Sequence, residues 1–442
     1  MAVSYGQAID VLQDEARRHN SEMKLRTEQV PIELAINRIS GDTVSAPQST
    51  PLWDTSAMDG YSLSSKATKH ASVQSPISFP VGGLIAAGKE PVLNAAGAEG
   101  HLLSCVEIMT GARFPDAAET GDVDFDCCVK FEDVKRIRDA TTGQISIQVS
   151  KPASYRQNRR SAGGDFQKGQ VVVTAGEIIR PRHIMALASV GIKQISVQPK
   201  LQIGLYSTGS ELLSHSKDQP NKLRIEDING PYIATALADS TKVEVHFLGT
   251  LDDKMDTIST TIMSDMNKHR YNLIITTGAV SAGRFDLIPP ALEKMGATIL
   301  FHRLGMRPGH PALFASIPCK SPGGPYEVPF FGLPGNPVAS AACLRFLVMP
   351  FICFLQSGSP ETPLKARLTR TENEKGDLLD QPITNVPHDK DVFRPGILSY
   401  NSEGKTEVLL ISDHSPGKVR PFLEANCWIH FHNGPSEAWE GV

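Results

Sequence analysis

Strand-like and helix-like segments alternate between residues 201 and 356, and this alternation limits the possible folds more than any other feature of the sequence. Four runs predict strands: LQIGLYST (201–208), KVEVHFLGT (242–250), NLIITTG (272–278) and ATILFHRL (297–304). Three segments between them predict helices: PYIATALADS (231–240), DKMDTISTTIMSDMNKH (253–269) and FDLIPPALEKMG (285–296). Residues 330–356 add a short strand and a long helix. Alternation at this spacing predicts a parallel, doubly wound α/β domain.

The segments on either side of this region have other patterns. YGQAIDVLQDEARR (5–18) has the apolar spacing of a helix, and the polar, Pro-rich residues 40–62 predict an extended passage. From about 72 to 152, short apolar runs alternate with Gly, Pro and Asp, which predicts a β-rich lobe. After Pro360, strand-like runs return and predict a small C-terminal β domain, with KARLTR, TEVLLIS and CWIHFH as its strands.

Charge and cysteine content exclude several classes of protein. The formal net charge is −4, from 44 basic and 48 acidic residues, which gives no support for a nucleic-acid partner or a membrane-binding surface. The seven cysteines are an odd number without a CxxC pair, which favours free thiols over a disulfide framework. The N-terminus has no apolar signal region. CLRFLVMPFICFLQ (343–356) is short for a membrane span and predicts a buried helix. We therefore expect a cytoplasmic protein.

Three loops leave the carboxyl ends of predicted parallel strands, where ligands bind in open α/β sheets. They are STGSEL (207–212), TTGAVSAGRFD (276–286) and FGLPGNPVAS (331–340). Glycines in such loops let backbone N–H groups approach an anion, and the following helix N-termini add positive dipole ends. Any one of these loops alone could be an ordinary turn, but three loops at one sheet edge favour a ligand site.

Carboxylates accompany these loops and suit Mg²⁺, which prefers oxygen ligands beside substrate phosphates. Glu211 lies in the first loop, Asp286 in the second, and Asp227 in IEDING (225–230). A helix cap or a solvated surface position is the alternative for each of them. Asp227 in particular precedes Asn229 and Gly230 and could be an N-cap or a turn residue.

The segment GMRPGHPALF (305–314) follows the fourth predicted strand. It contains Arg307 and His310, and Arg303 lies just before it. Arginine presents a planar fork of donors that matches oxyanions, and the prolines stiffen the loop that carries it. The alternative is a set of exposed charges on a rigid turn.

Two further clusters, DTSAMDGYSL (54–63) and QNRRSAGGDFQKG (157–169), look more like charged turns than sites from spacing alone.

Seven motifs occur in the order seen in the MoeA family, which includes the E domain of gephyrin and of plant and fungal molybdenum-cofactor proteins. They are SAMDGY, PVGGLIAAG, IMTGARFP, STGSEL, TTGAVSAGRFD, MRPGHP and GLPGNP, and the resemblance covers nearly the whole chain. It implies a multidomain α/β fold with an elongated four-part architecture. The parts are residues 1–50 with 153–185 (helical and linker), 51–152 (β-rich lobe), 186–356 (molybdopterin-binding-like α/β domain) and 357–442 (C-terminal β domain).

The resemblance also implies an activity, the insertion of molybdenum from molybdate into adenylylated molybdopterin, which gives molybdenum cofactor and AMP with the help of Mg²⁺. It implies a homodimer whose cleft joins the α/β domain of one subunit to the β lobe of the other. The resemblance does not extend to the adenylylating domain that some eukaryotic relatives carry, so we expect a separate molybdopterin adenylyltransferase to supply the substrate.

The family's functional positions map onto this sequence in three groups. The resemblance implies catalytic roles for Asp59, Thr110, Asp165 and Asp286. It implies metal binding by Glu211, Asp227 and Asp286. It implies contacts to pterin, phosphate or molybdate from Arg160, Thr208, Gly209, Gly278, Ser281, Gly283, Arg303, Arg307, His310, Pro334, Gly335 and Asn336.

Several of these positions depart from the family pattern. Ala279 replaces a glycine, Ser210 an aspartate, and the arginines and His310 stand where lysine is common. If position 279 requires a positive φ, alanine is strained there by roughly 1 kcal/mol. These departures motivate a second hypothesis, a catalytically weakened relative that carries molybdopterin or serves as a scaffold.

Overall fold

The computed structural model describes residues 2–23, 26–90, 92–93, 103–120, 123–212, 225–238, 242–281, 286–321, 324–356, 358, 361–369, 390–411 and 415–431. The chain forms two compact units. Unit 1 contains residues 1–29, 35–41 and 196–442, and unit 2 contains residues 30–34 and 42–195. The chain crosses between the units within strand β2 (Glu28–Pro31), again between residues 34 and 35 and between residues 41 and 42, and finally within strand β14 (Gln194–Val197).

A six-stranded sheet with the order β16-β15-β17-β21-β20-β18 forms the centre of unit 1. Its strands are β15 (Leu201–Thr208), β16 (Val243–Leu251), β17 (Leu273–Thr277), β18 (Thr298–His302), β20 (Leu313–Ser321) and β21 (Gly324–Leu333). Strands β16, β15, β17 and β21 pair in parallel, which confirms the first three predicted strands. The fourth prediction was wrong in its pairing: β18 lies at the sheet edge and pairs with β20 in antiparallel register. Strand β20 was not predicted, and it lies between β18 and β21 and pairs with both in antiparallel register. The short strand expected from residue 330 is the end of β21.

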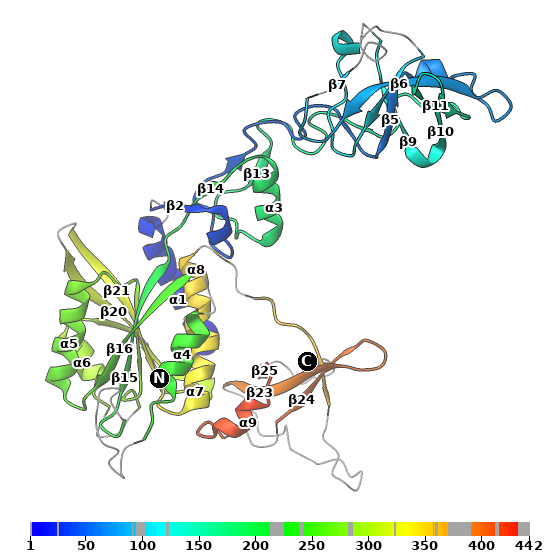
Figure 1. Cartoon of the computed structure of the whole chain (residues 1–442). Helices are drawn as coiled ribbons and strands as arrows, with labels where there is room; N and C mark the ends of the chain where they lie inside the picture. The colour runs from blue at the N-terminus through cyan, green and yellow to red at the C-terminus, as the bar shows by residue number, and fades with distance from the viewer. Residues whose placement is uncertain are drawn as a thin grey trace. The chain divides into compact units, whose positions relative to one another are not determined.

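Helices cover both faces of this sheet, as a doubly wound fold requires (Figure 1). One face packs against α1 (Tyr5–Met23), α4 (Asn229–Ala238), α7 (Pro337–Cys343) and α8 (Met349–Leu355). The other face packs against α5 (Met255–Lys268) and α6 (Ile288–Lys294). Because α4 and α5 lie on opposite faces, the connections leaving β15 and β16 diverge. The carboxyl ends of the parallel strands therefore border a crevice.

The apolar segment that joins α7 to α8 is a core helix with one π turn, η5 (Leu344–Val348). Pro350 has no backbone N–H, so it cannot bond to the Phe346 carbonyl four residues earlier. The Tyr5 hydroxyl donates to that carbonyl at 3.3 Å instead. Burial, and then the nearby Asp391 carboxylate, raise the pKa of Tyr5 to about 12, which keeps this donor protonated. Pro337–Leu355 is the one described helix long and apolar enough to cross a membrane, and 72% of it is buried inside the protein.

A second sheet in unit 1 joins the chain's two ends, with the order β1-β19-β23-β24-β22 and with β25 paired to β23. Its strands are β1 (Val3–Ser4), β19 (Leu304–Arg307), β22 (Arg367–Thr369), β23 (Asp391–Tyr400), β24 (Thr406–Leu410) and β25 (Cys427–Phe431), and helix α9 (Val419–Leu423) precedes β25. The predicted runs after Pro360 are strands β22, β24 and β25. The central strand β23 was not predicted, because Pro395 and Gly396 interrupt its apolar pattern.

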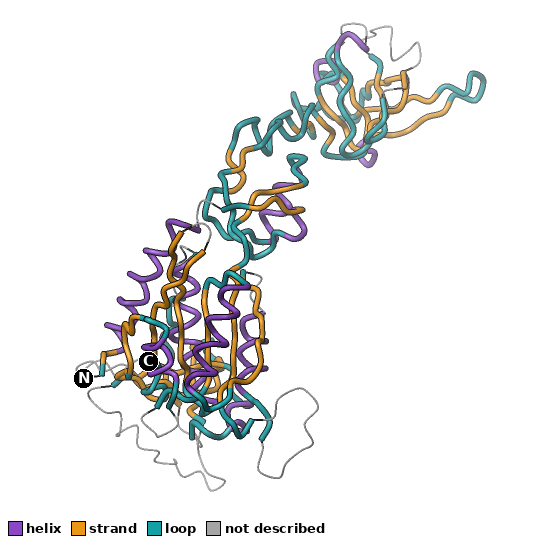
Figure 2. Tube along the Cα trace, turned by 90° about the vertical axis from the view of Figure 1, so that its left-hand side faces the viewer, coloured by secondary structure: helices purple, strands orange, loops and turns teal. Residues whose placement is uncertain are grey.

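Unit 2 consists mostly of strands and loops (Figure 2). Its larger sheet has the order β10-β11-β6-β8-β5-β9, with β7 paired to β6. These strands are β5 (Gly60–Leu63), β6 (Ile77–Ile85), β7 (Val92–Leu93), β8 (Cys105–Ile108), β9 (Cys127–Lys130), β10 (Val134–Arg138) and β11 (Ile145–Val149). Among the residues that the structure describes, unit 2 also contains the short pairs of β3 (Val44–Ser45) with β13 (Val171–Val173) and of β4 (Thr55–Ser56) with β12 (Arg159–Arg160), as well as helix α3 (Pro181–Ser189). The β-rich lobe is confirmed.

All seven cysteines are free thiols, as predicted. Five of them are buried. Burial raises the pKa of the Cys105, Cys127 and Cys343 thiols, so these side chains are neutral packing groups at physiological pH.

Candidate active-site cavity

A cavity of about 620 Å³ lies beyond the carboxyl ends of β15, β16, β17 and β21. The three predicted loops meet there, together with the start of α4. Its lining consists of Thr208, Gly209, Glu211, Leu212, Ile225–Asn229, Asp253, Thr277–Ser281, Asp286, Pro311, Pro334–Pro337 and Gly417. The structure thus brings together Thr208, Gly209, Glu211, Asp227, Gly278, Ser281, Asp286, Pro334, Gly335 and Asn336 from the predicted site. Gly283 lies outside the described residues.

Glycines allow the three loops to pack closely. Gly278 has φ of 88°, and a Cβ at this position would lie 2.8 Å from the carbonyl and hydroxyl oxygens of Thr208. The Gly278 N–H donates to the Leu333 carbonyl, so it ties the second loop to the third. A Cβ on Gly335 would lie 3.7 Å from the Gly278 Cα. Any larger residue at position 278 would push the loops apart.

Only some of the loop amides are available to a ligand. The N–H groups of Gly209, Ser210 and Gly278 already have acceptors, which are Leu251 O, an Asp253 oxygen and Leu333 O. Those of Ala279, Ser281 and Gly335 have no acceptor within the described part of the chain. These three N–H groups are therefore the candidates for binding an anion in the cavity.

Ala279 has φ of 54°, which lies in the left-handed region of backbone conformation. Position 279, where the family pattern has glycine, therefore does adopt a positive φ. An alanine in this conformation is strained by roughly 1–2 kcal/mol relative to glycine. We expect Ala279→Gly to raise the free energy of unfolding of unit 1 by about 1 kcal/mol, as measured by urea denaturation. Ala236→Gly in helix α4 is the control and should lower it by a similar amount. A loss of stability in Ala279→Gly would show that the alanine is not strained.

Asp227 has its carboxylate oxygens engaged in capping helix α4. Oδ1 accepts the Gly230 N–H at 3.1 Å, and Oδ2 accepts the Ser207 hydroxyl at 2.5 Å. The residue is only 8% exposed. Of the roles considered for Asp227, the structure shows the helix cap, and the metal-ligand role stays a prediction.

Three other carboxylates remain beside the loops. The Glu211 carboxylate lies over Gly209, because a Cβ on that glycine would come within 2.6 Å of both its oxygens. Asp253, which follows β16 and was not predicted, accepts the Ser210 N–H at 2.9 Å. Asp286 is half-buried and lines the cavity from the second loop. Oxygen donors of this kind fit Mg²⁺.

The segment GMRPGHPALF is not the single rigid loop that the sequence predicted. Residues up to Arg307 form strand β19, and Leu313 begins β20. The intervening turn reaches the cavity through Pro311, whereas Arg303, Arg307 and His310 do not line it. The His310 ring nitrogen Nδ1 lies 2.6 Å from the Leu304 carbonyl oxygen and donates to it. Strand β19 pairs with the C-terminal sheet, and the binding role that the resemblance implies for these three residues stays a prediction.

Arg307 instead has a like-charged neighbour, Arg394, which the sequence analysis missed. Arg307 lies opposite Val392 in the parallel pair β19–β23, and Arg394 follows two residues later on the same face. Burial, and then the charge of Arg307, lower the pKa of the Arg394 guanidinium. Neither guanidinium has a carboxylate partner in the described ranges. Only the pairing of β19 with β23, which are remote in sequence, brings these two arginines together.

In unit 2, two predicted site residues are in direct contact. The Thr110 N–H donates to Asp59 Oδ1 at 2.7 Å, and both residues are exposed. The turn requires Gly60, because a Cβ there would lie 2.1 Å from the Val129 carbonyl oxygen. The motif SAMDGY therefore fixes the orientation of an exposed carboxylate.

Arg160 and Asp165 lie elsewhere in unit 2 and are exposed. Arg160 is in strand β12, opposite Thr55 of β4. Its neighbour Arg159 has a structural role, since its Nε donates to Asp54 Oδ2 at 2.7 Å. Burial alone would raise the pKa of Asp54, but hydrogen bonds from the Ala162 N–H and from two arginines outweigh burial and lower it.

Known proteins similar to this chain cover almost its whole length. Residues 3–191 match the family described as "MoeA N-terminal region (domain I and II)", and residues 204–353 match "Probable molybdopterin binding domain". A protein of Synechococcus elongatus named molybdopterin molybdenumtransferase is 32% identical over 354 residues, which are 80% of this chain and 80% of that protein. The protein of that name from Bacillus subtilis is 30% identical and aligns with 92% of this chain and 86% of its own length.

A solved structure shares the fold. The molybdopterin biosynthesis MoeA protein from Pyrococcus horikoshii matches with a TM-score of 0.71 and 25% sequence identity. The match covers 98% of this chain and 95% of that protein.

Proposed function

Because this chain belongs to the MoeA family of molybdopterin molybdenumtransferases, we propose that it inserts molybdenum into adenylylated molybdopterin. This reaction is the last step of molybdenum cofactor biosynthesis and gives the cofactor and AMP. The observation that carries the proposal is the 620 Å³ cavity, in which three glycine loops and several carboxylates meet within the molybdopterin-binding domain.

The cavity offers donors for the phosphate groups of the substrate. The free N–H groups of Ala279, Ser281 and Gly335 would bind phosphate oxygens, and Asn336 contributes a polar side chain. The Thr208 hydroxyl donates to the Thr277 carbonyl and holds the first loop against the second. Preorganised donors of this kind stabilise the negative charge that develops on AMP as it leaves. They do so without reorganising, because hydrogen bonds between the loops fix their positions.

Mg²⁺ dependence is part of the proposal. Glu211, Asp253 and Asp286 would hold the ion, and Mg²⁺ bound there would neutralise charge on the phosphates. Asp253 supplies a carboxylate next to Ser210, the position where the family pattern has aspartate. An acidic side chain therefore still lies beside this loop, although Ser210 replaces the aspartate of the family pattern.

Molybdate is the proposed second substrate, and Arg307 and Arg394 would bind it. A pair of guanidinium groups without carboxylate partners suits a tetrahedral dianion, since each presents a fork of N–H donors. The turn that follows Arg307 reaches the cavity through Pro311. Molybdate would thus be held beside the pterin.

A homodimer completes the proposal. Asp59, Thr110, Arg160 and Asp165 would come from the β-rich unit of a second copy and face the cavity, as in the family. A separate molybdopterin adenylyltransferase would supply the substrate, and the protein would act in the cytoplasm.

AMP release tests the proposal directly. We expect the purified chain, mixed with adenylylated molybdopterin, Mg²⁺ and molybdate, to release AMP at a rate that depends on molybdate. Chromatographic quantification of AMP with and without molybdate, and with a chelator in place of Mg²⁺, provides the measurement. Tight binding of the pterin without molybdate-dependent AMP release would favour the carrier hypothesis instead.

A further inference from the structure

His302, the last residue of β18, reaches the glycine loop that follows β17. Its ring nitrogen Nε2 lies 2.9 Å from the Val280 carbonyl oxygen. A carbonyl oxygen only accepts hydrogen bonds, so Nε2 carries the proton and donates it. His302 does not line the 620 Å³ cavity, and the proposed reaction gives it no contact with the substrate.

The six-stranded sheet holds the His302 ring beside this loop. His302 lies opposite Leu313 of β20 in the antiparallel pair β18–β20, so the two side chains lie on the same face of the sheet. Leu313 and Val280 both belong to the buried core on that face. The next residue, Arg303, has φ of 71° where the chain leaves this sheet for β19. The ring is therefore fixed at the end of a paired strand.

The hydrogen bond to Val280 also sets the direction of the following amide. The peptide bond between Val280 and Ser281 is trans. In a planar trans peptide, the C=O and the N–H point in opposite directions. Because the Val280 C=O points toward His302, the Ser281 N–H points away from it, on the side of the cavity that Ser281 lines. This N–H has no acceptor among the residues that the structure describes, so it is a free donor.

Backbone hydrogen bonds orient the preceding part of the loop. The Gly278 N–H donates to the Leu333 carbonyl at 2.9 Å, and the Ala279 carbonyl accepts the Ile288 N–H at 3.2 Å. The next carbonyl is instead held by a side chain, that of His302. A single substitution can therefore release this peptide without changing the loop itself.

We propose that His302 is a positioning residue for the anion-binding loop, which it orients so that the Ser281 N–H donates to a phosphate oxygen of the substrate. This inference rests on the proposed function, since it takes the phosphate groups of adenylylated molybdopterin as the ligand of the loop. A donor that is fixed before the ligand arrives binds more tightly than one that must be ordered on binding. Loss of the His302 contact would leave the Val280 carbonyl unpaired and let the peptide rotate.

Binding of AMP to the full chain, measured by isothermal titration calorimetry, tests this role. We expect His302→Leu, which removes the donor, to raise the Kd for AMP roughly fivefold. His302→Gln keeps an N–H donor at the end of a side chain of similar reach, and it should return the Kd to within about twofold of the unsubstituted value. A role in packing alone would not separate glutamine from leucine in this way.

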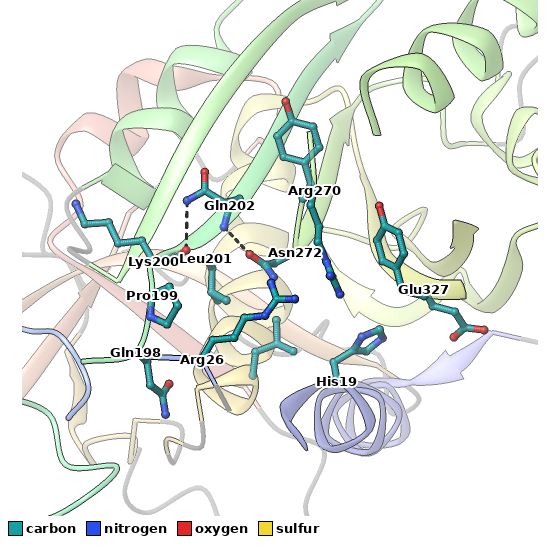
Figure 3. A pocket seen from close by; sticks show the side chains of 13 residues that line it. His19, Arg26, Gln198, Pro199, Lys200, Leu201, Gln202, Arg270, Asn272 and Glu327 are labelled. Atoms are coloured by element: carbon teal, nitrogen blue, oxygen red, sulfur yellow. Dashed lines mark hydrogen bonds between the residues drawn. The ribbon is translucent and has the colours of Figure 1, made fainter. Parts of the chain in front are cut away.

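His246 provides the matched control, toward the amino ends of the parallel strands. Its Nε2 lies 2.8 Å from Gln202 Oε1, so a histidine of edge strand β16 makes a side-chain contact of similar length. Gln202 lines a separate cavity of about 200 Å³, which shares no lining residue with the 620 Å³ cavity (Figure 3). His246→Leu should therefore leave the Kd for AMP unchanged. Urea denaturation of each variant shows how much stability the substitution costs.

The outcomes keep this inference separate from the proposed function. A higher Kd in His302→Leu, with recovery in His302→Gln, supports the positioning role even if the chain releases no AMP in the presence of molybdate. An unchanged Kd in His302→Leu, equal weakening in both His302 variants, or an equal effect of His246→Leu would overturn it, even if molybdate-dependent AMP release occurs. Absence of saturable AMP binding to the unsubstituted chain would overturn it as well.

Discussion

Replacing Asp286 by asparagine is expected to lower molybdate-dependent AMP release by roughly 10²–10³-fold. Asp286 is half-buried in the 620 Å³ cavity, where its charge would hold Mg²⁺ against the phosphates of the substrate. Asparagine keeps the size of the side chain and removes the charge. The turnover number should therefore fall while the fold persists, and single-turnover AMP release measures the effect.

Two comparisons make this result specific. Asp256→Asn removes an exposed carboxylate on helix α5 that pairs with Lys294, and it should leave AMP release unchanged. Titration of Mg²⁺ should show a weakened metal dependence in Asp286→Asn alone. Turnover at the wild-type rate in Asp286→Asn would contradict the role proposed for this carboxylate.

Arg394→Gln is expected to raise the KM for molybdate by roughly 10–100-fold, which corresponds to the loss of one charge-assisted contact of about 1.5–3 kcal/mol. The affinity for adenylylated molybdopterin should change little, because Arg394 is not among the residues that line the 620 Å³ cavity. Steady-state AMP release over a range of molybdate concentrations, with pterin binding measured separately, provides the test.

The double variant with Arg307→Gln examines whether the two guanidinium groups act as a pair. If both bind one dianion, the two substitutions together should raise KM by less than the product of their separate effects. Arg367→Gln, an exposed change in strand β22 of the same sheet, is the control. A rise in pterin Kd equal to the rise in molybdate KM would mean that Arg394 only supports the fold.

Sequence patterns that act over short distances predicted the α/β domain well. Strand β15 has the predicted boundaries, and α4, α5, β16 and β17 lie where periodicity placed them. The three glycine loops meet because parallel strands end at one edge, a rule that requires no knowledge of tertiary contacts. The positive φ at position 279, by contrast, was raised as a question only by the family pattern, which has glycine there.

Features that depend on contacts between distant segments could not be predicted. The hairpin β20–β21 inserts between β17 and β18, and nothing local to ATILFHRL indicates that its neighbour is antiparallel. Arg307 belongs to the C-terminal sheet because β19 pairs with β23, more than eighty residues away in sequence. The hydrogen bond from Ser207, at the end of β15, to the Asp227 carboxylate also joins segments that are twenty residues apart in sequence.

The division of the chain between its two units sets an order of events during synthesis on the ribosome. Residues 42–195 are contiguous and emerge before the partners of helix α1 exist. The apolar face of α1, with Ala8, Leu12 and Ala16, packs in the same core as α8, which begins at Met349. At roughly 5–20 residues per second, the nascent helix waits roughly 16–65 s for that partner. The amino-terminal segment is therefore a natural substrate for chaperones that shield exposed apolar surface, while the inserted unit can fold cotranslationally.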